Sequence, residues 1–311
     1  MFMERTAETK KTSWCIAVCV DQDMLPGFQA TIRSLVFHCS SPSRIRIKVF
    51  SDDLLEADIE NLRSDLTAAG ICTDLKLIKA DLSIFSTFKS LHGNRLTYYR
   101  ILLPQILGFE DYVVYLDSDL WVGLDILTIL DHLPSAHPFA AGGIGTVEYS
   151  LEASFFRSLG MNNNDATFNA GVIVFNCKRC AEVGFVKRCL DFANHYPDAL
   201  LSADQTILNA LFCRDFYPLP EPFNRLITPH QRLSETLDPA IYHFVGSPKP
   251  WDLLGSWIHR SARLWKATIK HTSYHHNRWL ILNLGGMLRR TWSIRRSYLR
   301  ELRRRMRSDS N

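Results

Sequence analysis

Short apolar runs alternate with amphipathic stretches along the first part of the chain. The apolar runs are rich in β-branched and aromatic residues and predict buried strands at 14–20, 45–50, 73–80 and 112–117. Apolar residues at helical spacing between these runs predict helices at 26–36, 54–66 and 94–107. Alternating strands and helices indicate an α/β fold with a mostly parallel central sheet, flanked by helices and joined by right-handed crossovers.

The pattern is looser after residue 119. The expected elements are a short helix at 125–133, a strand at 139–144, a partly helical loop at 145–166, a buried strand at 168–176, and helices at 180–196 and 203–212. Ser202 is a candidate cap for the last of these helices. A short strand at 242–245 then leads into a Gly- and Pro-containing loop that carries Lys249.

Two carboxylates follow the apolar run at 112–117. Asp117 and Asp119 are two residues apart, and strand residues at that spacing point to the same face. Open α/β sheets bind their ligands at this carboxyl edge. Adjacent carboxylates repel each other and need protons or a cation, and hard oxygen donors suit Mg²⁺ or Mn²⁺ bound together with phosphates. We favour this metal site over the alternative, in which either aspartate caps a following turn.

The first strand-to-helix turn carries carboxylates instead of a glycine-rich fingerprint. A dinucleotide-binding fold would place G-x-G-x-x-G here, whereas this chain has Asp21 and Asp23. Carboxylates can accept hydrogen bonds from a base or a ribose but would repel phosphate. A phosphate bound here must therefore be neutralised elsewhere, which again indicates a cation at Asp117 and Asp119.

Residues 260–311 differ in charge from the rest of the chain. They contain fourteen Lys or Arg against Glu301 and Asp309, a net charge of about +12, while the whole chain carries only +4. The part before residue 260 is therefore acidic, at about −8. We divide the chain into a polar N-terminal segment (1–13), a main domain (14–259) and a basic, aromatic C-terminal tail (260–311).

The apolar residues of this tail follow one helical stripe, with arginines crowding the other positions. The stripe consists of Leu288, Trp292, Leu299, Leu302 and Met306. This pattern favours an amphipathic helix on an anionic membrane surface. The alternative is a helix packed on the acidic body. Nucleic-acid binding is disfavoured because no nucleic-acid-binding module accompanies the arginines.

Other features indicate the compartment. Residues 1–13 contain no apolar h-region, so we expect no secretory signal. No apolar stretch reaches the roughly 18 residues that cross a bilayer. Eight Cys lie mostly in apolar runs, and the Cys177/Cys180 spacing lacks the second pair of a zinc site, so we expect reduced core thiols. Together these predict a cytoplasmic protein, peripheral on the inner face of the plasma membrane.

Five separated motifs across residues 14–251 resemble glycosyltransferase family 8, the retaining GT-A enzymes that include bacterial lipopolysaccharide glucosyl- and galactosyltransferases. The motifs are Val20-Asp21 with Arg33-Ser34, Thr97-Tyr-Tyr-Arg100, Tyr115-Leu-Asp117-Ser-Asp119, Phe168-Asn-Ala-Gly-Val172, and Asp204-Gln205 followed by His243-x-x-Gly246-x-x-Lys249. The resemblance implies a GT-A (Rossmann-like) fold and transfer of a sugar from a UDP-sugar.

The resemblance also implies roles for single residues. Asp117, Asp119 and His243 look like the ligands of Mn²⁺ (or Mg²⁺), and Gly246 and Lys249 resemble the loop that holds the diphosphate. The remaining donor contacts implied are Asp21, Asp23, His92, Arg100 and Ser118 toward the nucleotide, and Asn169, Ala170, Asp204 and Gln205 around the sugar. Where the family commonly stacks a Tyr on uracil, this chain has Met24.

Retention of configuration would ordinarily call for a carboxylate nucleophile near the anomeric carbon. Gln205 is the best-placed candidate by resemblance, but an amide is a poor nucleophile. We therefore favour front-face attack, in which the leaving phosphate takes the acceptor's proton and Gln205 stabilises the oxocarbenium-like state. Asp204 is the rival nucleophile.

The sequence thus predicts a hexosyltransferase that uses UDP-glucose or UDP-galactose. The acceptor would be a lipopolysaccharide-core or related, lipid-linked glycan. One alternative is a metal-dependent hydrolase of nucleotide diphosphates that uses the same carboxylates. Another is a non-catalytic nucleotide-sugar-binding protein that is recruited to membranes.

Overall fold

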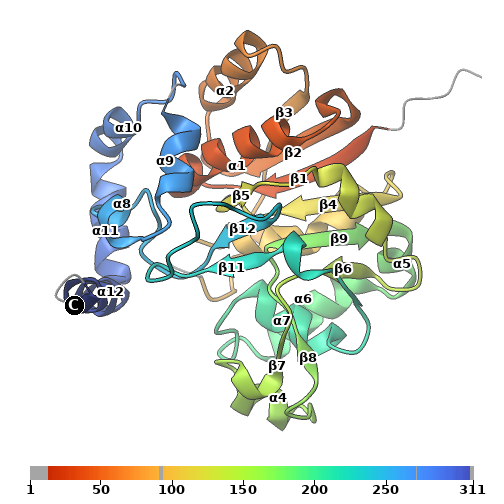
Figure 1. Cartoon of the computed structure of the whole chain (residues 1–311). Coiled ribbons are helices and arrows are strands. Elements are labelled where there is room, and N and C mark those ends of the chain that lie inside the picture. Colours follow the sequence, from red (N-terminus) through yellow and green to blue (C-terminus); the bar gives the residue numbers. More distant parts are fainter. Residues whose placement is uncertain (1–12, 91–93, 271, 309–311) are drawn as a thin grey trace, which may run out of the picture.

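The computed structural model describes residues 13–90, 94–270 and 272–308. The strands of its central sheet are β1 (Trp14–Cys19), β2 (Ile45–Ser51), β3 (Asp74–Lys79), β4 (Tyr112–Leu116), β6 (Phe139–Ala141), β9 (Val172–Asn176) and β10 (Tyr217–Pro218). They lie in the order β10-β6-β9-β4-β1-β2-β3 (Figure 1). All neighbours are parallel except that β9 runs antiparallel to β4 and β6. The predicted α/β fold with a mostly parallel sheet is confirmed.

The helices cover both faces of this sheet. Alternate residues of β1 enter different cores: Ala17 packs with one cluster, and Val18 with the other. The helices on the Val18 side are α1 (Leu25–His38) and α2 (Glu56–Ala68). Those on the Ala17 side are α3 (Leu103–Ile106), α5 (Cys177–Glu182), α6 (Phe185–His195) and α7 (Asp204–Phe212).

Two smaller sheets complete the main domain. One contains β5 (Leu120–Val122), β11 (Arg225–Ile227) and β12 (Ile241–Phe244), in the order β11-β12-β5. The other pairs β7 (Gly145–Thr146) with β8 (Ala166–Thr167), and α4 (Ala153–Ser158) lies between them in the chain. In Figure 1 this second pair and α4 form a lobe below the central sheet.

Several predicted helices differ in detail. The stretch 94–107 is a 3₁₀ helix (Leu96–Leu102) followed by α3, which carries Pro104 in its first turn, where a missing N–H costs no hydrogen bond. The predicted helix at 180–196 is two helices parted at Gly184, whose φ of 63° is left-handed. Ser202 does not cap α7, because Ala203 occupies the N-cap position and no side chain caps it.

The eight cysteines are free; six are buried as expected of core thiols, whereas Cys213 is half-buried and Cys72 is exposed. Cys177 and Cys180 are both buried on α5 and pack in the same core as Phe185. Burial raises the pKa of the Cys177 thiol to about 12. Both thiols are therefore protonated core residues and not a redox pair.

The tail folds into helices that pack against the main domain. The helices after residue 254 are α8 (Gly255–Ile258), α9 (Arg263–Ile269), α10 (His276–Leu282), α11 (Leu284–Ser293) and α12 (Arg295–Ser308). Trp279 and Met287 are buried in the same core as Val18, and the Trp265 indole donates a hydrogen bond to the carbonyl of Pro26 at 2.9 Å. Within the described ranges, no helix is long and apolar enough to cross a membrane.

The predicted apolar stripe is distributed over two helices. Leu288 and Trp292 lie on α11, and Leu299 and Met306 on α12; all four are exposed, whereas Leu302 is half-buried. Ile294 separates the two helices and is buried. The tail therefore has both a face packed on the body and an exposed apolar face.

Candidate active site

The pairing of two short strands brings the predicted metal ligands together. Asp119 immediately precedes β5, and β12 pairs antiparallel with β5 so that His243 lies opposite Leu120. The backbone N–H of Phe244 donates to the carbonyl of Asp119 at 3.0 Å. As a result, one ligand atom from each of Asp117, Asp119 and His243 lies within 4.8 Å of the other two.

A chain of amides sets the tautomer of His243. The N–H of Gly171 donates to Asn169 Oδ1 at 2.9 Å, and Asn224 Nδ2 donates to the same oxygen at 3.0 Å. Asn224 therefore turns its own Oδ1 toward His243 Nδ1, 3.1 Å away. Because an amide oxygen only accepts, Nδ1 must carry the proton. His243 Nε2 is then left with its lone pair, as a metal ligand requires.

That lone pair faces the two carboxylates. His243 Nε2 lies 3.1 Å from Asp119 Oδ1 and 3.7 Å from Asp117 Oδ2. Asp119 Oδ1 is buried and accepts no hydrogen bond from the described residues. Two carboxylates and an imidazole lone pair repel one another unless a cation lies between them. These residues therefore fit a divalent metal such as Mn²⁺ or Mg²⁺.

Lys249 is close to the same cluster. Its ammonium lies 2.6 Å from Asp119 Oδ2 and also donates to the carbonyl of Phe244. Although burial raises the pKa of the Asp119 carboxyl, the nearby Lys249 ammonium lowers it and holds it well below its usual value. Asp119 is therefore ionised at neutral pH. The backbone N–H of Lys249 donates to Asp252 Oδ2 at 2.7 Å, which fixes the start of the loop.

Arg100 is a buried cation beneath the carboxylates. Its guanidinium forms ion pairs with Asp117 at 3.0 Å and with Asp204 at 2.8 Å. It also lies 4.5 Å from the centre of the Tyr115 ring and donates to the carbonyl of Ala170 at 2.5 Å. Arg100 thus links β4, β9 and α7 below the site, and it directs Asp117 toward the other metal ligands.

Asp204 and Gln205, the two candidate catalytic residues, differ in their burial and in the polar contacts that they make with the protein. Asp204 is 2% exposed and accepts from Thr97 in addition to its ion pair with Arg100. Burial raises the pKa of Asp204 to about 6, against the opposing effect of Arg100. Gln205 is half-buried, and its Oε1 accepts from Asn169 Nδ2 and from the N–H of Ala170, each at 3.1 Å.

A group of carboxylates lies at the other end of the site. Asp21 caps the short 3₁₀ helix Gln22–Met24, accepts from the Met24 N–H at 2.9 Å, and also accepts from Asn94. Burial, together with Asp23 and Asp53, raises the pKa of the Asp21 carboxyl to about 6. This end can accept hydrogen bonds from a ligand but would repel its phosphates.

One cleft of about 770 Å³ joins these groups. Of the residues predicted from the sequence, Asp21, Asp23, Arg100, Asp117, Ser118, Asp119, Gly246 and Lys249 line it. Asn169, Ala170, Asp204, Gln205 and His243 support the wall through the hydrogen bonds and ion pairs described above. His92 lies outside the described residues.

Sequence reasoning missed two parts of the site. Asn224, buried just before β11, orients His243, but its partners lie far away in the sequence. Gly286, Arg289, Arg290 and Ser293 of α11 also line the cleft. The sequence predicts residues 284–293 as part of a tail that binds a membrane surface or packs on the body, and their apolar and basic pattern does not indicate a cleft wall.

The chain resembles several characterised proteins. Lipopolysaccharide 1,2-glucosyltransferase of Escherichia coli (strain K12) is 25% identical over 285 residues, which are 85% of this chain and 80% of that protein. General stress protein A of Bacillus subtilis (strain 168) is 23% identical over 255 residues, which are 76% and 87% of the two chains.

Solved structures and a family profile agree with these matches. The galactosyltransferase LgtC, in complex with donor and acceptor sugar analogs, superimposes with a TM-score of 0.71 at 21% identity, covering 85% of this chain and 98% of that one. This likeness shows a GT-A-like fold. Residues 15–255 match the profile of Glycosyl transferase family 8, whose members use a nucleotide-sugar donor and a divalent metal. The chain therefore belongs to glycosyltransferase family 8 and is a glycosyltransferase.

Proposed function

We propose that this enzyme transfers glucose or galactose, with retention of configuration, from UDP-glucose or UDP-galactose to a lipopolysaccharide-core or related lipid-linked glycan. The relative from E. coli is by name a lipopolysaccharide glucosyltransferase, and LgtC is by name a galactosyltransferase. The observation that carries the proposal is the cluster of Asp117, Asp119 and His243, whose two aspartates line a cleft large enough for a nucleotide sugar.

We assign the cluster to Mn²⁺ (or Mg²⁺), with Asp117, Asp119 and His243 as its ligands. The metal, when bound, would neutralise negative charge that develops on the diphosphate as the sugar leaves. Lys249 would then donate to the same phosphates, because its partner Asp119 would be engaged as a ligand. Asp21 and Asp23 would accept hydrogen bonds from the nucleoside at the other end of the cleft.

The hydrogen bonds and ion pairs of the two candidate catalytic residues, Asp204 and Gln205, favour front-face attack over a covalent intermediate. Asp204 is buried and held by Arg100 and Thr97, so it would have to break two contacts to act as a nucleophile. Gln205 sits beside Ala170, and its amide dipole can stabilise positive charge that develops on the donor sugar. One similar solved structure is an active-site mutant of LgtC in which a glutamine is replaced by glutamate.

The test is release of UDP from a panel of UDP-sugars, with Mn²⁺ or EDTA, and with or without a core-oligosaccharide acceptor. We expect release from one sugar donor, stimulated by the acceptor and lost in EDTA and in Asp117→Asn. Release that does not depend on acceptor would instead identify a metal-dependent hydrolase. Binding of UDP-sugar without turnover would identify a non-catalytic nucleotide-sugar-binding protein.

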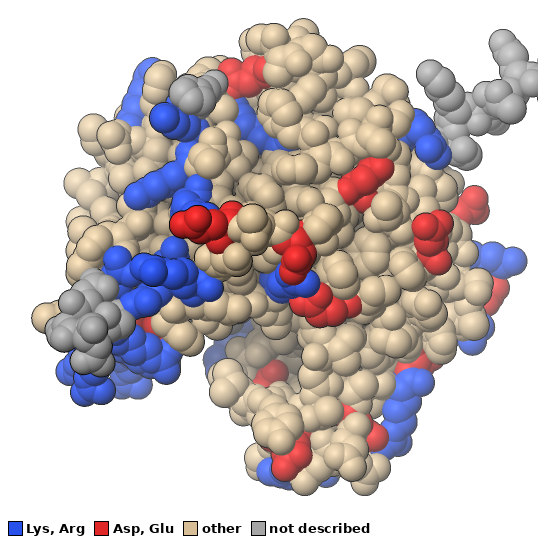
Figure 2. Space-filling view, in the orientation of Figure 1, with Lys and Arg blue, Asp and Glu red and all other residues tan. Residues whose placement is uncertain are grey.

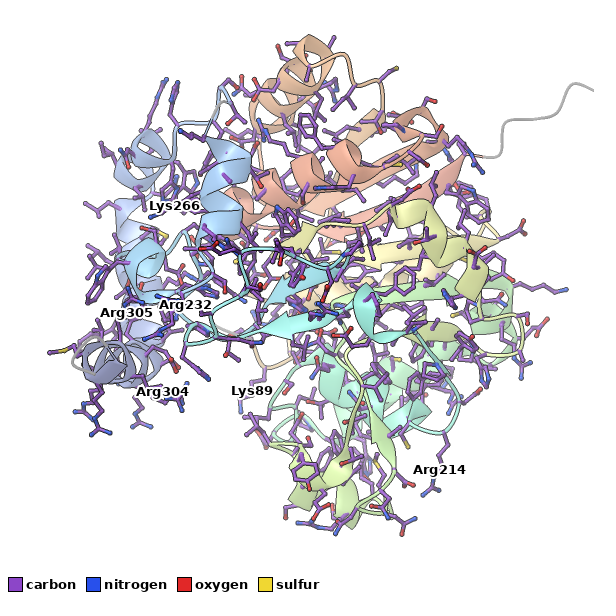
Figure 3. The ribbon with its side chains drawn as sticks, in the orientation of Figure 1. Lys89, Arg214, Arg232, Lys266, Arg304 and Arg305 are labelled. Atoms are coloured by element: carbon purple, nitrogen blue, oxygen red, sulfur yellow. The ribbon has the colours of Figure 1, made fainter. Side chains whose placement is uncertain are left out.

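We also propose that the tail holds the enzyme on an anionic membrane surface, at the inner face of the plasma membrane. Ile281, Leu284, Leu288 and Trp292 recur every three or four residues along α10 and α11, and all are exposed. Figure 2 shows Lys and Arg gathered over this end of the molecule. Figure 3 labels Arg304 and Arg305 on α12 and Arg232 in the loop before β12, and Arg304 Nη1 lies 3.1 Å from His230 Nδ1 of that loop. Exposed apolar residues beside clustered arginines are typical of interfacial helices.

Flotation with vesicles tests this second proposal. The double variant Leu288→Glu/Trp292→Glu should lose binding to vesicles that contain phosphatidylglycerol, and neutral vesicles should bind neither protein. Leu151→Glu is the matched control, because Leu151 is 91% exposed on the distant lobe near α4. Equal flotation of the wild type and the double variant would contradict the proposal.

A further inference from the structure

Helix α11 forms a wall of the cleft although it lies beyond the part of the chain that matches the family. The matched residues end at 255, whereas α11 begins at Leu284. Gly286 allows the helix to approach the first turn of the domain closely, because a Cβ placed there would lie 3.1 Å from Asp23 Oδ1. The cleft is therefore closed by residues that the family match does not include.

The lining of the cleft carries more carboxylates than cations. Asp21, Asp23, Asp53, Asp117 and Asp119 all line the cleft. Four basic residues line it as well within the described ranges, namely Arg100, Lys249, Arg289 and Arg290. A ligand that carries phosphates can bind only if these cations, together with a metal, outweigh the carboxylates.

Three of the four cations already have protein partners. Arg100 pairs with Asp117 and Asp204, and Lys249 pairs with Asp119. Arg290 donates to Asp252 at 2.8 Å, and Asp252 in turn accepts from the Lys249 N–H, so Arg290 ties α11 to the lysine loop.

Arg289 differs from its neighbour on the same helix. It is exposed at the rim of the cleft and makes no hydrogen bond or ion pair with any residue that the structure describes. Its Nη2 lies 4.0 Å from the position that a Cβ on Gly286 would occupy. The guanidinium therefore lies on the turn of α11 between Gly286, which faces Asp23, and Arg290, which is tied through Asp252 to the Lys249 loop. An unpaired guanidinium at this place is available to a ligand, and it suits phosphate because it can donate two parallel hydrogen bonds.

We propose that Arg289 is a donor-binding residue, which contacts the diphosphate of the UDP-sugar from the α11 wall of the cleft. This inference rests on the proposed function, because it presupposes a nucleotide diphosphate in the cleft. It adds a cation that is independent of the metal and of Lys249. It also assigns part of the donor site to the tail.

The experiment compares ligands that differ only in their phosphates. Binding of UDP and of uridine to the full chain, in the presence of Mn²⁺, is measured by titration calorimetry for wild type and Arg289→Gln. We expect UDP affinity to fall about tenfold to a hundredfold, the loss typical of a hydrogen bond to a charged group. Uridine affinity should not change. Arg289→Lys, which keeps the charge but not the two parallel donors, should lie between the two proteins.

Arg296→Gln is the matched control. It removes the same charge from an exposed arginine of α12 that does not line the cleft, so UDP affinity should stay at the wild-type value. Thermal unfolding of each variant checks that the fold is intact.

Three results would overturn the inference. Equal UDP affinity in wild type and Arg289→Gln would show that Arg289 does not contact the donor. A parallel loss of UDP and uridine affinity would move the contact to the nucleoside. If the wild type binds no UDP at all, the proposed function fails first, and the inference fails with it.

Discussion

At the scale of single residues, the position of the proton on His243 determines whether the cluster can hold a metal. Asn224 Oδ1 accepts from Nδ1 and leaves Nε2 free to act as a ligand. Asn224→Ala removes that partner and should weaken Mn²⁺ binding about tenfold to a hundredfold, as loss of an orienting partner does in metal sites. Calorimetric titration with Mn²⁺ measures the change.

The control for this variant is Asn163→Ala. Asn163 is exposed, and its side chain accepts from Arg157 far from the cluster, so Mn²⁺ affinity should not change. Unaltered Mn²⁺ affinity in Asn224→Ala would show that His243 keeps its tautomer without the asparagine.

Gly171 leaves space for the same imidazole. A Cβ at this position would lie 2.3 Å from His243 Cε1. Gly171→Ala should therefore displace the ring, reduce Mn²⁺ affinity and lower the free energy of unfolding by about 1–3 kcal/mol. Gly285→Ala on α11 is the comparison, because nothing lies within 4 Å of its added methyl. That change should stabilise the helix by roughly 0.5–1 kcal/mol, and denaturant unfolding of both variants checks the opposite signs.

Some residues of this site could be predicted from local sequence patterns, and others could not. The convergence of Asp117 and Asp119 follows from their spacing at the end of a strand, which is a local property. His243 and Lys249 are 124 or more residues away along the chain. They were assigned from the pattern of a strand histidine followed by a Gly-x-x-Lys loop, and then from the resemblance. Asn224 was not predicted, because its role depends on the pairing of β11 with β12 and on the amide of Asn169, which no local pattern encodes.

At the scale of elements, the docking of the C-terminal helices should be sensitive to acid. Burial lowers the pKa of His259, at the end of α8, from 6.5 to about 3. The unfolded chain therefore binds a proton between these pH values that the folded protein does not. Stability from this group is fully present above pH 6.5 and falls as the pH drops toward 3, by up to about 1.4 kcal/mol per pH unit.

The measurement is the free energy of unfolding at several pH values between 5 and 7. His259→Asn loses the packing of the ring on Phe244 and should be less stable throughout. Its dependence on pH in this window should nevertheless be shallower than that of the wild type. The same slope in both proteins would assign the acid sensitivity to other groups.

The longer strands and helices of the main domain were predicted in the right order. The short strands β5, β10 and β11 were not predicted, and the helix expected at 125–133 is a 3₁₀ helix (Ile126–His132). The directions and interruptions of the elements were not predicted either. An apolar run indicates a buried strand but does not indicate the direction in which that strand crosses the sheet. The antiparallel orientation of β9 could therefore not be predicted from the sequence. The break between α5 and α6 depends on one left-handed residue, Gly184, within an otherwise helical pattern. Similarly, the 3₁₀ form of Leu96–Leu102 follows from its packing and not from its residue spacing.

At the scale of the whole molecule, the C-terminal helices are part of the core. Trp279 of α10 is 5% exposed, whereas Trp292 of α11 is 70% exposed. Trp279→Ala should therefore lower the free energy of unfolding by about 3–5 kcal/mol. Trp292→Ala should change it by no more than about 0.5 kcal/mol. Denaturant unfolding of both variants measures these changes. A small change in the free energy of unfolding for both variants would show that the tail is not packed stably on the body.

Helix α11 presents two faces with different neighbours, since Gly286 and Arg290 line the cleft while Leu288 and Trp292 face solvent. If a membrane binds the outer face and a nucleotide the inner one, each ligand orders the same helix for the other. Thermodynamic reciprocity then requires that the two affinities change by the same factor. Vesicles should raise the affinity for UDP by the factor by which UDP raises the affinity for vesicles. Titrations in both orders measure this coupling, and no change in either would show that the two faces act independently. With such coupling, sugar donor would be captured mainly by enzyme already at the bilayer, where the proposed lipid-linked acceptor would reside.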